Sequence, residues 1–314
     1  MTILIVAGDP SGDLHAANLA AALKAASPGI KIAAVGGQKL RAVADEFIED
    51  LASRGVTGFW EPVFKIGFLL GLLKHLKAFL EKRKPDALIC VDYYGFNRRV
   101  LSLAETAGVP AFYFISPQVW ASRPARVGVL KKLVRKMFVI FPFEEKIYRE
   151  AGVPVSFVGH PLLDLLPNPK PIAPVEPPLQ IGLLPGSRTG EVSRHLPVMV
   201  EAFLKFKRHF PQSRPVIFAS SHLPDSAYGA GLAVGAEIVR EPGYSRRRAM
   251  DLALCSSGTA TLENALLGVP MVVVYKMSWP TYAIARAIIS VPYIAMANIL
   301  AGKELLPELI QHHA

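Results

Sequence analysis

The sequence contains few cysteines, with only Cys90 and Cys255 among its 314 residues. Two cysteines cannot form the disulfide framework of a small secreted protein, and their spacing suits no metal site. Free cysteine is among the residue types most often buried in protein cores. We therefore expect both thiols to be reduced and packed inside, as in a cytoplasmic protein.

Long hydrophobic runs are also missing. The longest candidate for a membrane segment, residues 66–73, lies between Lys65 and Lys74. A helix that crosses a bilayer needs about 20 apolar residues, so we expect no transmembrane segment. The first residues, MTILIVAGD, lack the basic region of a secretory signal and instead predict a β-strand.

Acidic residues are outnumbered, with 25 Asp and Glu against 35 Lys and Arg and a formal net charge of +10. A basic surface favours nucleic acid, anionic membranes or phosphorylated small molecules as partners. The sequence has neither zinc-finger spacing nor an aromatic and basic motif for single strands, so nucleic acid is the least favoured of the three.

Short apolar runs alternate with helical stretches along the whole chain, a pattern typical of parallel, doubly wound sheets. The expected strands are residues 2–7, 31–35, 87–91, 111–115, 136–140, 155–158, 180–184, 216–219, 252–254 and 271–275. The expected helices are residues 14–26, 63–83, 97–107, 124–133, 143–151, 191–208, 259–267 and 281–289.

Six prolines between residues 164 and 178 interrupt this alternation. Such a segment can form neither a helix nor a central strand, so we predict a stiff linker at residues 165–178. The linker separates two Rossmann-like α/β domains, residues 1–164 and 179–314, which we expect to face a cleft that binds a small molecule.

Polar side chains follow several of the expected strands, where ligands bind in open α/β sheets. Asp92 ends one strand beside three aromatic residues, so its pKa could be raised and it could act as a base, or it could simply cap the strand. The segment after residue 115 carries Gln118, Trp120 and Arg123. The loop at Ser11, Gly12 and Asp13 either hydrogen-bonds sugar hydroxyls or caps the helix expected from Leu14.

Two loops of the second half have the character of phosphate sites. Gly186 and Ser187 expose backbone N–H donors just before a helix, and Arg188 adds a guanidinium group that can form two parallel hydrogen bonds. Residues 256–263 repeat the arrangement, with donors at Ser257, Gly258, Thr259 and Thr261. Glu263, in the first turn of that helix, either accepts ribose hydroxyls or complements the helix dipole. Together the loops indicate a nucleotide.

The stretch from residue 59 to 73 is apolar on more than one helical face. It contains Phe59, Trp60, Phe64, Phe68, Leu69 and Leu72, and several lysines follow it. It is either a buried helix or an interfacial helix that contacts acyl chains and places its basic residues at lipid headgroups.

In this order, the segments resemble the lipid-A-disaccharide synthase family of GT-B-type glycosyltransferases over almost the whole chain. The matching segments are AGDPSGDLHA at 7–16, VDYYGFN at 91–97, ISPQVWASRPARV at 115–127, FPFEEKIY at 141–148, FVGHPLLD at 157–164, LLPGSR at 183–188, SSGTATLENALLGVPMVVVYK at 256–276 and NILAGKELLPELIQ at 298–311.

The resemblance implies the joining of UDP-2,3-diacylglucosamine to 2,3-diacylglucosamine 1-phosphate, which forms a β(1→6) disaccharide and releases UDP. It implies Asp92 as the catalytic base, Arg188 as the diphosphate ligand and no metal. It also places Asn298, Glu308 and Gln311 near the cleft. The expected setting is the cytoplasmic face of the inner membrane, with peripheral attachment to anionic phospholipid, and a homodimer is a further expectation.

The chain departs from the family pattern at Ser122, Thr57, Gly95 and Lys303, and Lys303 lacks the bidentate fork of the more common Arg. Relatives usually continue for several helices past the segment that matches Gln311. Besides an active transferase, two alternatives stay open. One is a shortened relative that binds nucleotide-sugar or lipid without turnover, and the other is a UDP-sugar epimerase of the same fold.

Overall fold

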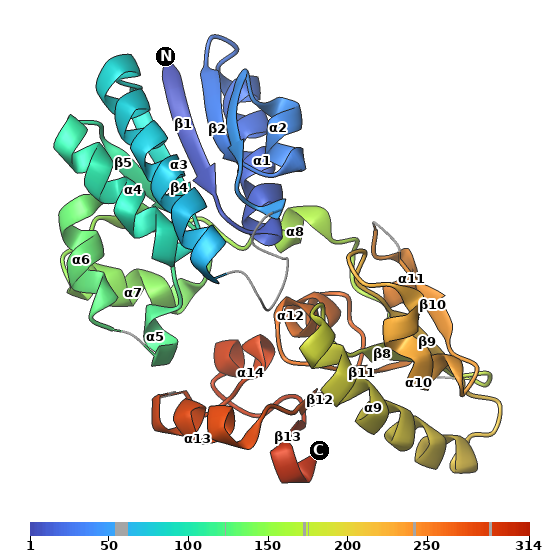
Figure 1. The fold of residues 1–314 in the computed structure, drawn as a ribbon. Helices are drawn as coiled ribbons and strands as arrows, with labels where there is room; N and C mark the ends of the chain where they lie inside the picture. Colours follow the sequence, from blue (N-terminus) through green and yellow to red (C-terminus); the bar gives the residue numbers. More distant parts are fainter. Residues whose placement is uncertain (54–61, 123, 172–173, 175, 241–242, 289–290) are drawn as a thin grey trace. The chain divides into compact units, whose positions relative to one another are not determined.

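A computed structural model describes residues 1–53, 62–122, 124–171, 174, 176–240, 243–288 and 291–314. These residues form two compact units, Met1–Pro161 and Leu162–Ala314, each built around its own parallel sheet (Figure 1). The strand-helix alternation of the sequence is therefore confirmed as two Rossmann-like α/β units.

The sheet of unit 1 has seven parallel strands in the order β3-β2-β1-β4-β5-β6-β7. Their bounds are β1 Thr2–Ala7, β2 Lys31–Gly36, β3 Glu46–Asp50, β4 Ala87–Val91, β5 Ala111–Phe114, β6 Lys136–Val139 and β7 Val155–Phe157. The strand β3 was not expected from the sequence. Its residues, EFIED, are mostly acidic because β3 is an edge strand with no fully buried residue.

Helices cover both faces of this sheet. They are α1 Pro10–Ala26, α2 Gln38–Val43, α3 Pro62–Arg83, α4 Tyr94–Ala107, α5 Val119–Ser122, α6 Arg126–Leu133 and α7 Pro142–Glu150. The helices α3 and α4 lie on one face and α1 and α2 on the other (Figure 1). The central strand β1 is buried on both sides, which explains its continuous apolar sequence.

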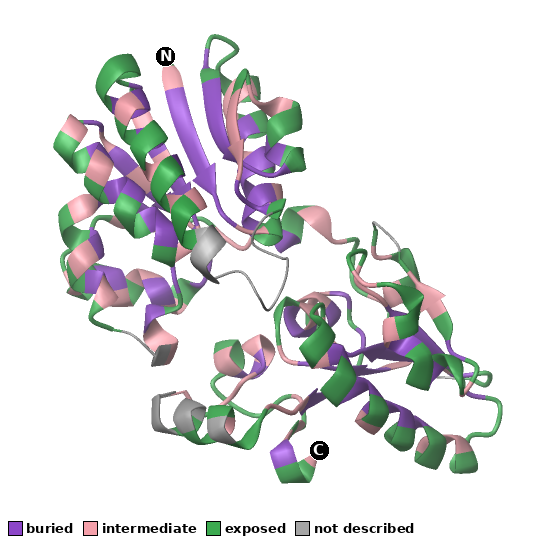
Figure 2. Cartoon of the chain, viewed as in Figure 1, coloured by how far each residue is buried: buried purple, intermediate pink, exposed green. Residues whose placement is uncertain are grey.

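From the sequence, the apolar residues of α3 could pack in the core or contact a membrane, and those on its inward face pack in the core. Leu72, Leu76 and Leu80 belong to the main core of unit 1, and Phe68 packs against it. Assigning Leu72 to a membrane surface was therefore wrong, because this side chain is only 4% exposed. The apolar residues that face outward are instead Ile66 and Leu70, and Figure 2 shows the exposed and buried sides of the helix.

Unit 2 has a six-stranded parallel sheet in the order β10-β9-β8-β11-β12-β13. The strands are β8 Gln180–Leu184, β9 Arg214–Phe218, β10 Glu237–Val239, β11 Leu252–Cys255, β12 Met271–Tyr275 and β13 Glu308–Ile310. The two edge strands, β10 and β13, were not predicted, because three residues are too short to show a period.

The helices of unit 2 are α8 Leu162–Leu165, α9 Thr189–His209, α10 Gly229–Leu232, α11 Ser245–Arg248, α12 Thr259–Leu266, α13 Trp279–Ile288 and α14 Met296–Ala301, with 3₁₀ turns at Asp225–Tyr228 and Gln311–His313. The proline-rich segment contacts this unit. The backbone N–H of Lys170 donates to the Leu267 carbonyl at 2.7 Å, and the Lys170 ammonium pairs with Asp251 at 3.0 Å. Among the described helices, none is long and apolar enough to cross a bilayer.

Candidate active site

The carboxyl ends of three neighbouring strands of unit 1, namely β4, β5 and β6, come together at one edge of the sheet. The segments that follow them line a cavity of about 730 Å³. Asp92 and Tyr93 line it from the end of β4, Ser116 and Gln118 from the segment after β5, and Phe141 from the segment after β6. Polar side chains that follow β4 and β5 thus line one cavity within this unit.

Asp92 lies in a strained turn at the junction of β4 and α4. Asp92 and Tyr93 both have a φ of 45°, in the left-handed region that ordinary residues rarely adopt. Residues held there cost about 1–3 kcal/mol each and persist only where their surroundings enforce the conformation. Three hydrogen bonds do so: the Asp92 N–H donates to the Phe114 carbonyl at 3.1 Å, and the Asp92 carbonyl accepts from Tyr113 Oη at 2.5 Å and Asn97 Nδ2 at 2.7 Å.

The electrostatic surroundings of Asp92 favour its protonated form. Burial is the main cause that raises the pKa of its carboxyl to about 6, and the nearby carboxylates of Asp9 and Glu144 add to the rise. The backbone N–H of Tyr93, which donates to Asp92 Oδ1 at 2.8 Å, opposes it. A carboxylate with this pKa is ionised at neutral pH and is a stronger base than an ordinary aspartate.

Glu144, which was not among the residues expected in the site, connects the segment after β5 to α7. One carboxylate oxygen accepts from Ser116 Oγ at 2.6 Å and Trp120 Nε1 at 3.2 Å, and the other accepts from the Phe141 N–H at 3.1 Å. Burial nevertheless raises the pKa of Glu144. The position of a glutamate in the first turn of an expected helix could have drawn attention to it.

The loop after β1 differs from expectation in the roles of its residues. Helix α1 begins at Pro10, and its cap is Asp9, whose carboxylate accepts from the Gly12 N–H at 2.6 Å. The buried Asp13 carboxylate accepts from three N–H groups at the start of α2, those of Gly37, Lys39 and Leu40, at 2.6, 3.0 and 3.1 Å. Asp13 therefore joins α1 to α2, and assigning its carboxylate to the acceptor was wrong. Ser11 is exposed.

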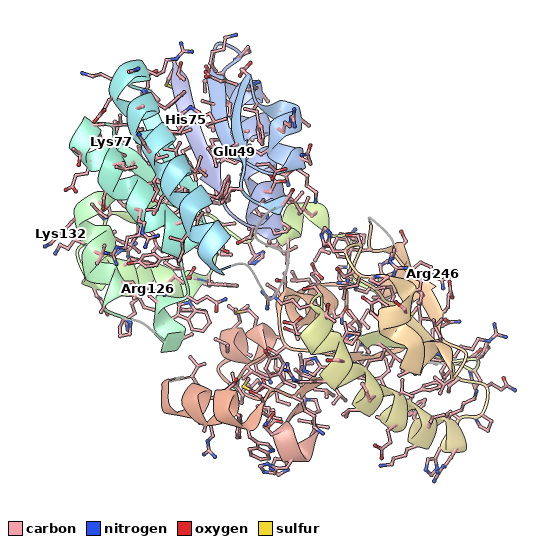
Figure 3. The ribbon with its side chains drawn as sticks, in the orientation of Figure 1. Glu49, His75, Lys77, Arg126, Lys132 and Arg246 are labelled. Atoms are coloured by element: carbon pink, nitrogen blue, oxygen red, sulfur yellow. The ribbon has the colours of Figure 1, made fainter. Side chains whose placement is uncertain are left out.

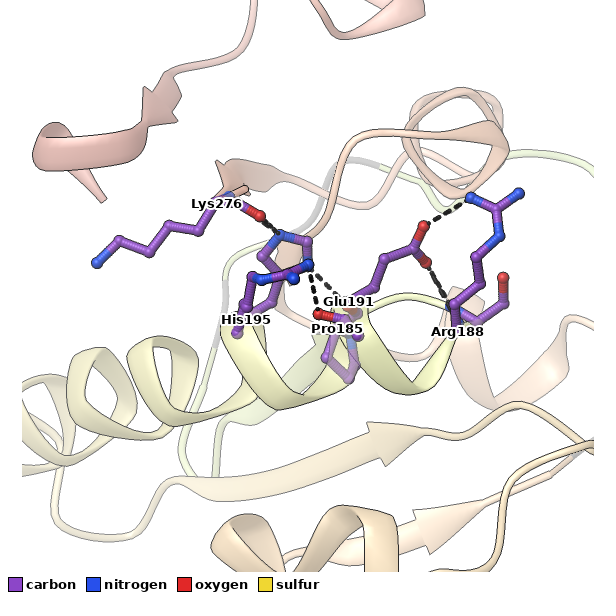
Figure 4. Close-up of polar contacts among 8 residues, drawn as sticks. Pro185, Arg188, Glu191, His195 and Lys276 are labelled. Carbon is purple, nitrogen blue, oxygen red and sulfur yellow. Dashed lines mark hydrogen bonds and ion pairs between the residues drawn. The ribbon is translucent and has the colours of Figure 1, made fainter. Parts of the chain in front are cut away.

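In unit 2, the loop from Pro185 to Arg188 presents anion-binding groups at the start of α9 (Figure 4). The Glu191 carboxylate accepts from the Ser187 N–H at 3.0 Å and the Arg188 N–H at 3.3 Å, and pairs with the Arg188 guanidinium at 2.9 Å. Gly186 has a φ of +115°, and a β-carbon there would lie 2.6 Å from Glu191. These donors thus already hold an anionic oxygen, and the Arg188 side chain is 83% exposed.

His195 fixes this loop to the end of β12, and no signal in the sequence pointed to it. It is fully buried, with Nδ1 at 2.9 Å from the Pro185 carbonyl oxygen and Nε2 at 3.0 Å from the Lys276 backbone nitrogen (Figure 4). Nε2 also lies 3.1 Å from the Lys276 carbonyl oxygen, so the ring joins the Pro185 loop to both backbone groups of Lys276.

The second phosphate-type loop precedes α12. Gly258 has a φ of 156° and a ψ of −163°, a conformation that essentially only glycine adopts. Two hydroxyls are bonded within the unit, since Ser257 Oγ donates to the Ile294 carbonyl at 2.8 Å and Thr261 Oγ1 donates to the Gly258 carbonyl at 2.8 Å. The backbone N–H of Thr259 follows directly at the start of the helix.

Glu263 has partners of its own in unit 2. Its carboxylate pairs with Arg247 and accepts from Tyr244 Oη at 3.1 Å. Burial and this carboxylate raise the pKa of Tyr244 to about 12, so the hydroxyl remains a donor. Protein groups therefore occupy two acceptor positions of Glu263, so its carboxylate does more than complement the helix dipole.

The family model "Lipid-A-disaccharide synthetase" matches residues 3–314. The lipid-A-disaccharide synthase of Syntrophus aciditrophicus is 41% identical over 98% of this chain and 84% of its own length, and that of Geobacter metallireducens is 39% identical over 99% and 84%. The chain belongs to this family.

Membership of the lipid-A-disaccharide synthase family makes the protein a glycosyltransferase of lipid A biosynthesis. Solved structures share the fold at low identity: UDP-GlcNAc 2-epimerase from Neisseria meningitidis bound to UDP-GlcNAc (TM-score 0.62, 14% identity, 96% of this chain and 90% of that one) and MurG from Acinetobacter baumannii (0.51, 14%, 91% and 82%). They support the GT-B fold class alone, whereas the family match disfavours the epimerase alternative.

The late family motif has a structural role in this chain. Asn298 Oδ1 accepts from the Leu305 and Leu306 N–H groups, at 2.8 and 2.9 Å. The Glu308 carboxylate accepts from Ile294, Ala295 and Asn298 at 2.8–2.9 Å. Gln311 exchanges hydrogen bonds with the backbone of Met277 at 2.8 and 3.2 Å. These contacts anchor the C-terminal segment on unit 2, so the three side chains serve the fold.

Some predicted site residues lie outside the described part of the chain. They are Phe59, Trp60 and Arg123, together with the side chain of Phe64. Within the described residues, the structure has no group of three or more His, Cys, Asp or Glu side chains that could hold a metal ion.

The raised pKa of Asp92 predicts that Asp92→Asn stabilises the protein at neutral pH. The folded-state pKa lies about two pH units above the ordinary value of 3.8, so ionisation at pH 7.5 costs up to about 3 kcal/mol, which the amide does not incur. The gain should shrink as the pH falls below 6 and be small at pH 3.5, where the wild-type carboxyl is mostly protonated in both states. Urea unfolding between pH 3.5 and 7.5 measures it, and a gain that does not depend on pH would contradict the shift.

Proposed function

We propose that the protein transfers the diacylglucosamine group of UDP-2,3-diacylglucosamine to the 6-hydroxyl of 2,3-diacylglucosamine 1-phosphate, with inversion at the anomeric carbon. The products are the β(1→6) disaccharide 1-phosphate and UDP. The observation that carries this proposal is Asp92, a carboxylate of raised pKa in a cavity of the expected acceptor unit. Family membership supports the class of reaction.

In the proposed mechanism, Asp92 accepts the proton of the acceptor 6-hydroxyl as its oxygen attacks the anomeric carbon of the donor. The bond from that carbon to the diphosphate oxygen breaks on the opposite face, and the electron pair leaves with UDP. General-base catalysis of this kind contributes about 10²–10⁴ in rate. The rigid turn at residues 92–93 fixes the orientation of the carboxylate, so no entropy is lost to orient it in each turnover.

The anion-binding groups of unit 2 suit the UDP diphosphate. The Arg188 guanidinium and the Ser187 N–H already hold the Glu191 carboxylate, and a diphosphate oxygen would replace it as the anion. The start of α12 offers further N–H groups at Gly258 and Thr259. These groups neutralise the charge of the leaving group, so the proposal includes no metal. Two solved structures of the same fold are described as bound to UDP-GlcNAc and to UDP, and those ligands are consistent with it.

For the acyl chains and the inner-membrane surface, we propose the outward face of α3. Ile66 and Leu70 are 58% and 59% exposed, and Lys74 and Lys77 continue the same helical face. Apolar side chains followed by cations suit a surface of acyl chains and anionic headgroups. Peripheral attachment at the cytoplasmic face of the inner membrane and assembly into a homodimer are further parts of the proposal.

Asp92→Asn should abolish most turnover while the protein still binds UDP. The amide keeps the acceptor for the Tyr93 N–H but cannot take a proton, so UDP release from both acylated substrates should fall about 10²–10⁴-fold. UDP affinity, measured by calorimetry, should stay within about twofold, and Glu105→Gln, an exposed change on α4, is the control. Wild-type turnover in Asp92→Asn would refute the base.

Arg188→Ala should weaken UDP binding about 10–100-fold, because a charge-assisted contact to the diphosphate is lost. Arg194→Ala is the matched control, since Arg194 lies on the same helix and bonds only to the Gly190 carbonyl among the described residues. Calorimetric titration with UDP measures both variants. Equal affinities would mean that the diphosphate binds elsewhere.

Changing Ile66 and Leu70 together to Ser should reduce sedimentation of the protein with vesicles of phosphatidylglycerol several-fold and leave its unfolding free energy unchanged. Leu72→Ser, two residues further along the helix but on its buried side, should instead lower the unfolding free energy by about 2–5 kcal/mol. Unaltered sedimentation of the double variant would exclude this face as the membrane contact.

A further inference from the structure

The cavity beside Asp92 is also lined by two arginines, Arg99 on α4 and Arg126 at the start of α6. Among the described residues, neither has a carboxylate within ion-pair distance, although Arg149 of the same unit pairs with Glu145 at 2.8 Å. Within the described part of the chain, the cavity therefore contains two guanidinium groups that form no ion pair.

Arg126 is held in a defined orientation. Its guanidinium carbon lies 4.4 Å from the centre of the Tyr94 ring, and the residue is partly buried. Stacking uses the flat face of the guanidinium and leaves its N–H donors directed outward in the plane of the group. A fork presented in this way suits a phosphate, which it can bind through two parallel hydrogen bonds. In Figure 3, Arg126 lies among the side chains of the unit, whereas Lys132 of the same helix extends outward.

The Arg126 guanidinium and the Asp92 carboxylate line the same cavity, a combination that suits a sugar phosphate with a nucleophilic hydroxyl. We propose that Arg126, assisted by Arg99, binds the 1-phosphate of the acceptor sugar. This inference rests on the proposed function. In the acceptor, the carbon that bears the 1-phosphate and the carbon that bears the 6-hydroxymethyl group both flank the ring oxygen, so the two groups lie along one edge of the sugar. A cavity that has a base and a cation on its walls can hold both groups at once.

Two further observations fit this occupant. The cavity, at about 730 Å³, is within the usual size range of small-molecule sites. Leu69 lines it and lies between Ile66 and Leu70 on α3, so an acyl chain can leave the sugar along an apolar surface. The carboxylates of Asp92 and Glu144 would repel a phosphate, and the two arginines offset that repulsion.

Steady-state kinetics of the full chain test the proposal with the acceptor and with its analogue that lacks the 1-phosphate. In Arg126→Ala, the KM for the phosphorylated acceptor should rise about 10–100-fold, with kcat and the donor KM nearly unchanged. Removing the phosphate should raise the acceptor KM of the wild type by a similar factor and leave the acceptor KM of Arg126→Ala almost unchanged. Arg126→Lys should recover part of the loss. The exposed pair Lys132→Ala and Arg98→Ala are the controls.

If removal of the 1-phosphate raises the acceptor KM as much in Arg126→Ala as in the wild type, the inference is overturned and the proposed function stays intact. If the wild type releases no UDP from any acylated pair, the proposed function fails, and calorimetry with glucosamine 1-phosphate then decides the site. Binding that weakens about tenfold or more in Arg126→Ala supports it. Equal or absent binding overturns it, as does binding of a short-chain phosphatidylglycerol in place of the sugar phosphate, which would assign the arginines to a lipid headgroup.

Discussion

The left-handed turn at Asp92 and Tyr93 is the constraint on which the site of unit 1 depends. Two consecutive non-glycine residues with a φ of 45° are held by the Tyr113 hydroxyl and the Asn97 amide, which both donate to the Asp92 carbonyl. Burial keeps the pKa of Tyr113 well above its usual value, so the donor retains its proton. The same turn starts α4 and places the Tyr93 ring where a β-carbon on Gly8 would lie 1.9 Å away.

Polar residues at the strand ends are divided between holding the fold and meeting a ligand. The side chains of Asp13, Glu308 and Asn298 form hydrogen bonds with backbone N–H groups and with side chains. Without these bonds, those groups would be buried without partners. His195 does the same for the phosphate loop of unit 2. Arg188 keeps an exposed guanidinium, and the Asp92 carboxylate lines a cavity. The proposed reaction uses Arg188 and Asp92. It depends on the rigidity that the residues bonded within the fold provide.

Much of the fold could be predicted from the sequence, because buried parallel strands are continuous apolar runs and their ends are marked by glycine, proline or aspartate. The short or acidic edge strands β3, β10 and β13 carry no such signal. Side-chain roles were harder to predict. Sequence spacing placed Asp9 and Asp13 in one polar loop, but only the three-dimensional position of α2 shows that Asp13 bonds to it. The direction that Leu72 faces likewise depended on where α3 packs.

The pH dependence of kcat/KM tests the central claim, that Asp92 is the base, most directly. The second ionisation of a sugar phosphate also lies near pH 6, so the profile is recorded with acceptors that carry and lack the 1-phosphate. With the acceptor that lacks phosphate, kcat/KM should fall about tenfold per pH unit below a pKa of about 6, and with the phosphorylated acceptor it should fall at least as steeply. A profile that stays flat from pH 7 to pH 4.5 with the acceptor lacking phosphate would contradict it.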